Sequence, residues 1–267
     1  MAKLIAVCDG HGMETPGKRT PPLPCDLMYN GKLRKKGTII HENEFNKTIM
    51  NKFIQGCKRC GINTIEVAPG DKDVPLQNRV NLANSKNADL YISFHANALA
   101  GTKWQTGAYG LVVIKHETCQ STTEKLAQNV YNYLKDGVDW YKNGGTKYGI
   151  RKDTDISGYS LYVLSKTKMP AILNEYGFMD NIEDVKRMVT DKFSTDCAEN
   201  TLKGVCKTLG VVYKAPTTNS PTDKVETPKN GFYRVLVGSY SNKTNAENKI
   251  EELKKKGIDA TLLFVEK

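Results

Sequence analysis

A chain of 267 residues with 39% hydrophobic and 25% charged residues has the composition of an ordinary globular protein, which excludes wholesale disorder. No apolar run approaches the roughly 20 residues of a membrane helix, so we expect no membrane span. The apolar run at the N-terminus is too short for a signal peptide, so we expect synthesis in the cytoplasm without one. The net charge of +10 favours anionic partners without choosing among them.

Strands and helices alternate along the first 213 residues. Strands are expected at residues 3–8, 62–68, 89–94, 109–114, 160–164 and 171–174, and helices at 44–60, 76–84, 122–134, 183–189 and 194–209. Residues 13–37 are rich in proline, glycine and basic side chains and predict a long irregular loop. The alternation predicts an α/β fold for residues 1–213, with a mostly parallel twisted sheet flanked by helices.

A linker and a small second domain are expected after this point. Residues 214–230 carry three prolines and four threonines with almost no apolar side chain, which is typical of a linker. Residues 231–267 then predict a strand at 232–237, a helix at 245–256 and a strand at 260–265, a small β-α-β domain. A segment of about 37 residues is too short to bury a good core alone.

The cysteines predict free thiols. There are seven of them, scattered along a chain with no visible export signal. Cys57 and Cys60 form a C-x-x-C pair at the end of a predicted helix, and no second pair accompanies it as a zinc knuckle would require. We therefore expect this pair to be chemically inert.

Three polar side chains follow predicted strands: His11, His95 and Glu175. Ligands of open α/β sheets bind beyond the carboxyl ends of the strands, so these side chains can converge there. Two imidazoles and a carboxylate are what a catalytic zinc site needs, with one position left for water.

The third ligand is expected just before the helix at 44–60, where three candidates stand close together. Glu42 and Glu44 both suit zinc, His41 is a further candidate, and periodicity does not choose among them. His116 also follows a strand, but we interpret it as an ordinary polar residue.

Four separated motifs occur in an order that resembles a known family. They are Gly10-His11-Gly12, Glu42 to Asn46, residues 76–84 continuing into 88–97, and residues 170–181. Together they resemble the zinc-dependent N-acetylmuramoyl-L-alanine amidases of the amidase-3 type, over about residues 3–210.

The resemblance implies a set of site residues. It makes His11, Glu42 and His95 the ligands of one Zn²⁺ per chain, because the family's glutamate ligand lies four residues before a helix asparagine, here Asn46. It also makes Glu175 the catalytic carboxylate.

Other positions are less closely matched. Asn97, two residues beyond a ligand, is expected either to bind substrate or to cap the strand end. Cys8 stands where the family commonly has an aspartate, so the sequence does not identify the group that orients the ring of His11. Asp9 lies next to Cys8, two residues before His11. The segment between Gly12 and Glu42 is long, so substrate contacts there cannot be inferred from the family.

The tail resembles part of a SPOR domain, a module that binds the glycan strands of peptidoglycan. Only one of the two β-α-β halves of such a domain is present in residues 231–267. A lone half leaves sheet edges open, and a second copy related by a two-fold axis could complete the sheet. We therefore expect a homodimer through residues 231–267, with packing of the tail on the catalytic domain as the alternative.

The sequence thus predicts a peptidoglycan hydrolase that cuts the amide bond between N-acetylmuramic acid and L-alanine. A phage endolysin or a bacterial autolysin would both fit, acting on the cell wall after lysis or release. One alternative is a non-catalytic protein that binds the wall or nucleic acid, with Tyr233 and Tyr240 stacking on bases, but the tail has no RNP-type motif and we expect no nucleic-acid partner. Another is a zinc peptidase that cuts the stem peptide.

Overall fold

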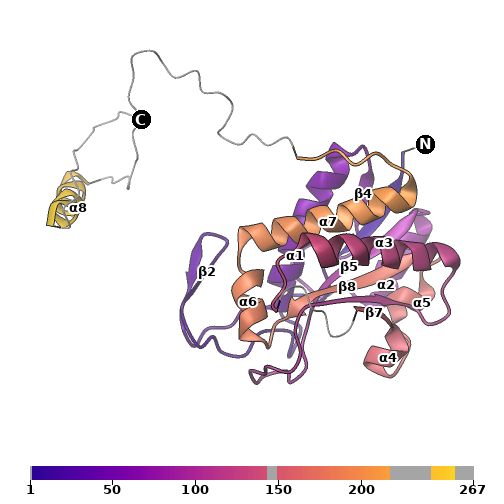
Figure 1. Ribbon diagram of the computed structural model, residues 1–267, viewed down its shortest axis with the longest axis horizontal. Helices are drawn as coiled ribbons and strands as arrows, with labels where there is room; N and C mark the ends of the chain where they lie inside the picture. The colour runs from indigo at the N-terminus through magenta and orange to yellow at the C-terminus, as the bar shows by residue number, and fades with distance from the viewer. Residues whose placement is uncertain (1, 143–148, 217–241, 256–267) are drawn as a thin grey trace, which may run out of the picture. The chain divides into compact units, whose positions relative to one another are not determined.

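The computed structural model describes residues 2–142, 149–216 and 242–255 (Figure 1). The chain divides into two compact units, Met1–Pro216 and Thr217–Lys267. Each unit is described by itself below.

A six-stranded sheet forms the centre of the first unit, in the order β4-β1-β5-β8-β6-β7. Its strands are β1 (Leu4–Cys8), β4 (Asn63–Glu66), β5 (Leu90–Asn97), β6 (Leu111–Lys115), β7 (Gly149–Lys152) and β8 (Ala171–Phe178). Neighbouring strands run parallel except β6 and β8, so β6 and β7 point against the other four. The central strands are apolar and buried along most of their length, as expected for strands covered on both faces. The predicted α/β fold with a mostly parallel sheet is confirmed.

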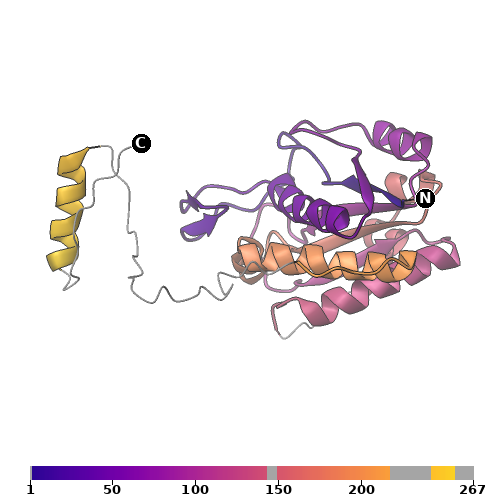
Figure 2. The same ribbon diagram turned by 90° about the horizontal axis from the view of Figure 1, so that it is seen from above.

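Helices cover both faces of this sheet. The larger core layer holds buried side chains of α1 (Glu42–Arg59), α3 (Ser121–Gly137) and α7 (Asp191–Leu209), and Figure 2 shows α7, in orange, beside α3. The other layer holds α2 (Leu76–Ser85) and α5 (Tyr162–Lys166). On α3 the predicted apolar stripe is fully buried, because Leu126, Val130 and Leu134 recur at every fourth residue and share one face. The short helices α4 (Asp153–Ser157) and α6 (Ile182–Met188) complete the unit.

The strand predicted at residues 160–164 is wrong, because most of this segment lies in the short helix α5. A short apolar run is compatible with either state, and packing against α2 decides for the helix. The strand β7 was not predicted. It lies at the edge of the sheet and its last two residues are exposed, so it lacks the apolar run of the central strands.

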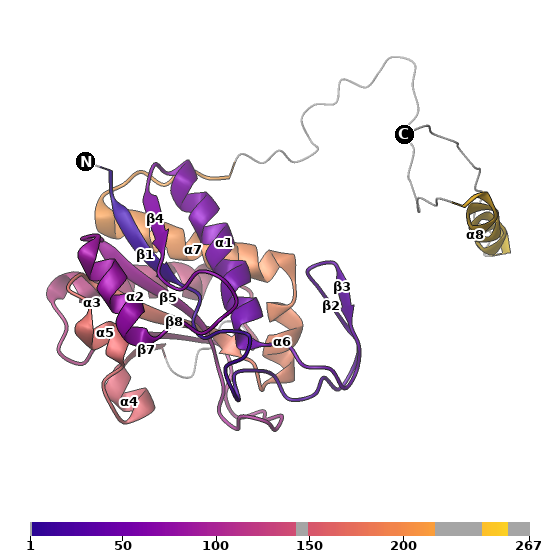
Figure 3. The same cartoon turned by 180° about the vertical axis from the view of Figure 1, so that it is seen from behind.

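The loop predicted at residues 13–37 contains a two-stranded hairpin, β2 (Leu27–Tyr29) and β3 (Lys32–Arg34). Asn30 and Gly31 form its turn with φ of 49° and 72°. Positive φ at both central residues is the reason that Asn-Gly favours tight hairpins. Figure 3 shows the hairpin standing clear of the main sheet.

The described part of the second unit is the helix α8 (Lys243–Lys255), which confirms a helix near the predicted residues 245–256. The predicted strands at 232–237 and 260–265 lie outside the described residues, as do residues 217–230 of the predicted linker. In the part of the chain that the structure describes, no helix is both long and apolar enough to cross a membrane. All seven cysteines are free, as expected.

Candidate active site

Three adjacent parallel strands carry the three polar side chains that the sequence analysis placed at strand ends. β1 ends at Cys8 and the chain turns through Gly10 to His11, while His95 lies on β5 and Glu175 on β8. His95 and Glu175 are direct partners in the register between β5 and β8. His95 and Glu175 therefore lie within their strands rather than after them. The side chains still converge near the carboxyl ends of the three strands, as expected.

The helix α1 brings a carboxylate to the same place, because it begins at Glu42. The Oε1 atom of Glu42 lies 3.0 Å from Nδ1 of His95, and Oε2 lies 3.5 Å from Nε2 of His11. One turn further along the helix, the side-chain amide of Asn46 donates to Oε1 of Glu42 at 3.3 Å. Ligand atoms of His11, Glu42 and His95 all lie within 4.8 Å of one another.

The other two candidates for the third ligand position have structural roles. Oε1 of Glu44 accepts a hydrogen bond from the backbone N–H of His41 at 3.0 Å, and Oε2 pairs with Arg34. The first bond is half of a capping box that fixes the start of α1. The fold therefore turns Glu42, and not Glu44, toward the two histidines.

The turn that carries His11 is held by Asn43, which the sequence analysis did not single out. The buried amide of Asn43 donates to the carbonyl oxygens of Gly10 at 2.9 Å and His11 at 3.2 Å, and to Oδ2 of Asp9 at 3.1 Å. Cys8, at the position where the family commonly has an aspartate, accepts a hydrogen bond from Nη1 of Arg79 at 3.0 Å. Asn43 thus positions the backbone of this turn.

The charge state of the cluster suits a cation. Burial acts to raise the pKa of Glu42, but the hydrogen bond with His95 and the nearby charges of His11, His95 and Lys18 lower it to about 2. Burial lowers the pKa of His11 to about 4, against the attraction of Glu42. At neutral pH the cluster therefore offers a carboxylate anion and an unprotonated imidazole at His11, the forms in which these side chains bind metals.

Three buried carboxylate oxygens have no hydrogen-bond partner among the described residues: Oδ1 of Asp9, Oε2 of Glu42 and Oε2 of Glu175. A buried polar atom without a partner is costly, and such an atom in a native fold points to a missing ion or water. A divalent cation between His11, Glu42 and His95 would satisfy Oε2 of Glu42. Two nitrogens and one carboxylate oxygen fit zinc in particular.

Glu175 lies beside this cluster in a different electrostatic state. Burial raises its pKa to about 7, helped by the charge of Glu42 and opposed by His95. A carboxyl group poised near neutral pH can both accept and return a proton.

Two further residues, one predicted and one not, lie at the edge of the site. The side-chain oxygen of Asn97 accepts a hydrogen bond from the backbone N–H of Ala98 at 2.8 Å, so Asn97 caps the end of β5. A contact of Asn97 with substrate stays a prediction. Lys18 was not predicted as a site residue, and its Nζ lies 3.7 Å from Oε2 of Glu42. No sequence signal marks this residue within the long segment 13–37.

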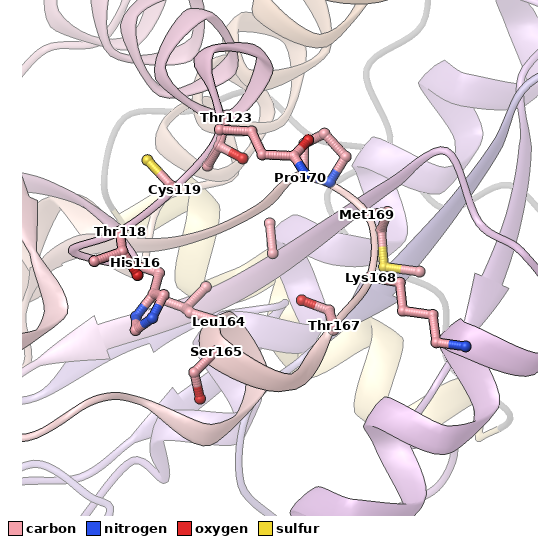
Figure 4. Close-up of a pocket in the computed structure, with 12 residues that line it drawn as sticks. His116, Thr118, Cys119, Thr123, Leu164, Ser165, Thr167, Lys168, Met169 and Pro170 are labelled. Carbon is pink, nitrogen blue, oxygen red and sulfur yellow. The ribbon is translucent and has the colours of Figure 1, made fainter.

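His116 lies away from the cluster and has a structural role. Its Nδ1 is 2.8 Å from Oδ2 of Asp153, a fully buried carboxylate. His116 also borders a cavity of about 130 Å³ (Figure 4). This cavity is lined by Ala171, the first residue of β8, whereas Glu175 lies four residues further along the strand. The pair of His116 and Asp153 thus supports the end of the sheet opposite the histidine cluster.

Two family profiles and several known proteins match this chain. A family profile described as N-acetylmuramoyl-L-alanine amidase matches residues 5–207, and a profile described as SPOR domain matches residues 211–263. The sporulation-specific N-acetylmuramoyl-L-alanine amidase of Bacillus subtilis (strain 168) is 26% identical over 204 residues, which cover 76% of this chain and 68% of that protein. The endolysin of Bacillus phage SPP1 is 30% identical over 200 residues, which cover 72% of this chain and 67% of the endolysin.

Solved structures show the same fold. The N-acetylmuramoyl-L-alanine amidase AmiC2 of Nostoc punctiforme superposes with a TM-score of 0.60 at 27% identity, over 78% of this chain and 97% of that chain.

Proposed function

The chain belongs to the N-acetylmuramoyl-L-alanine amidase family, and we propose that it uses one zinc ion to hydrolyse the amide bond between N-acetylmuramic acid and L-alanine in peptidoglycan. The observation that carries the proposal is the cluster of His11, Glu42 and His95, whose ligand atoms lie within 4.8 Å of one another beside Glu175.

Each side chain has a role in this proposal. His11, Glu42 and His95 would hold the zinc ion, which when bound supplies Lewis-acid polarisation and an acidified water. The carboxylate of Glu175 takes the proton of the attacking water and returns it to the nitrogen of the leaving amine. Its pKa near 7 allows both transfers at neutral pH.

The second unit supplies the contact with the wall in this proposal. The SPOR profile covers residues 211–263. Because resemblance to SPOR domains implies binding to glycan strands, we assign glycan binding to this part of the chain. The net charge of +10 favours approach to anionic wall polymers. An endolysin or an autolysin would act on the wall in this way.

We further propose that the chain forms a homodimer through residues 231–267, since the single β-α-β half that the sequence predicts there would leave sheet edges to be covered. Sedimentation of the full chain at micromolar concentration checks this proposal. A dimer is expected, and a monomer would contradict it.

The amidase proposal is tested by metal content together with product analysis. Wild type should carry one zinc per chain and release intact stem peptides that begin with L-alanine from purified walls, as read by mass spectrometry. His95→Ala should lose the metal, and Glu175→Gln should keep the metal and lose turnover. New amines inside the stem peptide would identify a peptidase instead, and an absence of any product would leave only a binding function.

A further inference from the structure

The segment that precedes the hairpin is fastened to the start of α1. The backbone N–H of Glu42 donates to the carbonyl oxygen of Lys18 at 2.9 Å. Two residues along, Thr20 and Ile40 are joined by a backbone hydrogen bond of 2.9 Å and by a bond of 3.1 Å from the N–H of Ile40 to the Thr20 hydroxyl. The backbone of Lys18 is therefore held at a fixed place beside Glu42.

From this place the side chain of Lys18 reaches the cluster. Its Nζ lies 3.7 Å from Oε2 of Glu42, and 42% of the side chain stays exposed. Its positive charge acts on Glu42, His11 and Glu175 alike. The ammonium group is thus partly open to solvent and at the same time close to the buried groups of the site.

The distance suggests what this ammonium group is for. A lysine that served only to neutralise Glu42 would bond to Oε2 and compete with a metal for it. At 3.7 Å the Nζ atom lies beyond hydrogen-bond range, so Oε2 is left available. Lys18 is therefore paired with Glu42 by charge without donating a hydrogen bond to it, so the N–H groups of Nζ can be donated to another acceptor.

We propose that Lys18 is a further catalytic residue, whose ammonium group donates a hydrogen bond to the oxygen of the scissile carbonyl while that oxygen becomes negative. The inference rests on the proposed amidase function. As the oxygen of water bonds to the carbonyl carbon, Glu175 takes one proton from that water. The C=O π electrons move onto the carbonyl oxygen, where Lys18 stabilises them without giving up its own proton. The C–N bond then breaks as those electrons return, and the leaving nitrogen takes its proton from Glu175.

Donors aimed at a developing oxyanion act mainly on the transition state, so their loss lowers kcat more than it raises KM. Lys18→Met keeps the length and apolar stem of the side chain and removes the charge. With a soluble muramoyl peptide, we expect its kcat to fall about 10²-fold, with KM within about twofold of wild type. Lys18→Arg should recover part of the loss.

The matched control is Lys186→Met, because Lys186 is exposed to a similar degree, 48%, and pairs with Glu183 on α6 rather than with a residue of the cluster. This variant should match wild type. Zinc content is measured for every variant and should not change. In a separate readout, a phosphinate analogue of the scissile amide should bind about 10²-fold more weakly to Lys18→Met than to the control.

Three results would overturn the role of Lys18. They are a wild-type kcat in Lys18→Met, a rise in KM with kcat unchanged, and a loss of zinc in parallel with the loss of activity. The second result would make Lys18 a substrate anchor, and the third a support of the metal site. If wild type itself releases no stem peptide, the amidase proposal fails, which is a distinct outcome.

Discussion

At the scale of single residues, Gly10 shows how closely the turn after β1 approaches the histidine cluster. Its φ is +54°, and a Cβ atom built there would lie 2.4 Å from Cε1 of His95. Any larger side chain must push the ring of His95 out of place. The ring needs its present orientation to serve as a ligand, because the geometry of the groups around a metal sets its affinity.

Gly10→Ala should therefore weaken zinc binding about 10- to 100-fold, the range typical of disturbed groups around a metal. A competition titration with a chromogenic chelator measures the effect. Gly31→Ala is the matched control, since Gly31 also has a positive φ, +72°, but a Cβ there meets nothing within 4 Å. Equal zinc affinity in the two variants would contradict the expectation.

A second residue-scale prediction concerns Asp184, which is buried beside the end of β8. Its Oδ2 accepts hydrogen bonds from the backbone N–H groups of Gly110 and Phe178, both at 2.8 Å. Burial nevertheless raises the pKa of Asp184 from 3.8 to about 6. Between these values the unfolded chain has lost this proton and the folded chain has kept it, so the contribution of Asp184 to folding stability falls as the pH rises.

Asp184→Asn keeps an acceptor oxygen for both bonds and removes the titration. Relative to wild type, the variant should gain about 2–3 kcal/mol in free energy of unfolding as the pH rises from 4 to 7. Urea unfolding at several pH values in this range measures the difference. A difference that stays constant with pH would show that Asp184 titrates normally.

At the scale of elements, one buried side chain of the hairpin of β2 and β3 packs against the start of α1. Tyr29 is 2% exposed, and its hydroxyl donates to the carbonyl oxygen of Glu44 at 2.8 Å. Its ring lies 5.3 Å from that of Phe45. The neighbouring Met28 points the other way and is 57% exposed, as alternation along a strand requires.

Tyr29→Ala should cost about 3–5 kcal/mol of unfolding free energy, the range for removing a buried aromatic side chain. Met28→Ala, one residue away, should stay within about 0.5 kcal/mol of wild type. Thermal and denaturant unfolding of the two variants compare them directly. Similar losses in both would mean that the hairpin does not pack as described.

The hairpin also shows which parts of the structure the sequence could predict. Its turn, Asn30-Gly31, is a strong local signal that a composition rich in proline and glycine concealed. The central strands and the long amphipathic helices were predictable because their apolar periodicity is local. The edge strand β7 and the short helix α5 were not, because packing against neighbours decides their state.

The same division applies to the candidate site. The positions of His11, His95 and Glu175 followed from the rule that polar groups gather where parallel strands end. The choice of Glu42 needed the family resemblance, because one helical turn offered several suitable side chains. Asn43 and Lys18 act through contacts between distant segments, with bonds such as that from Asn43 to Gly10, and no local pattern announces such contacts.

At the scale of the whole molecule, the first unit extends past the last turn of α7. Nε of Arg59 donates to the carbonyl oxygen of Lys214 at 2.8 Å, and the hydroxyl of Tyr213 donates to Glu199 at 2.7 Å. Arg59 and Glu199 are themselves paired at 2.5 Å. The segment after Gly210 is thus tied back to α1 and α7.

A chain ending at Pro216 should therefore unfold at the temperature of the first unit in the full protein, and should hydrolyse soluble muramoyl peptides normally. A chain ending at Gly210 should be less stable by about 1–3 kcal/mol, since it leaves the Arg59 and Glu199 network without two partners. Calorimetry on both fragments measures this. Equal stability would remove residues 211–216 from the folded unit.

The cluster also has a mechanical consequence. His11 and Glu42 bracket the whole segment that contains Lys18 and the hairpin, so a zinc ion bound to both would act as a crosslink that closes this long loop. Closing a loop in the folded state restricts how often the segment can open. The zinc concentration would then set the resistance of the enzyme to proteolysis as well as its catalytic rate. When the metal is removed, the hairpin would be the first segment to be cleaved.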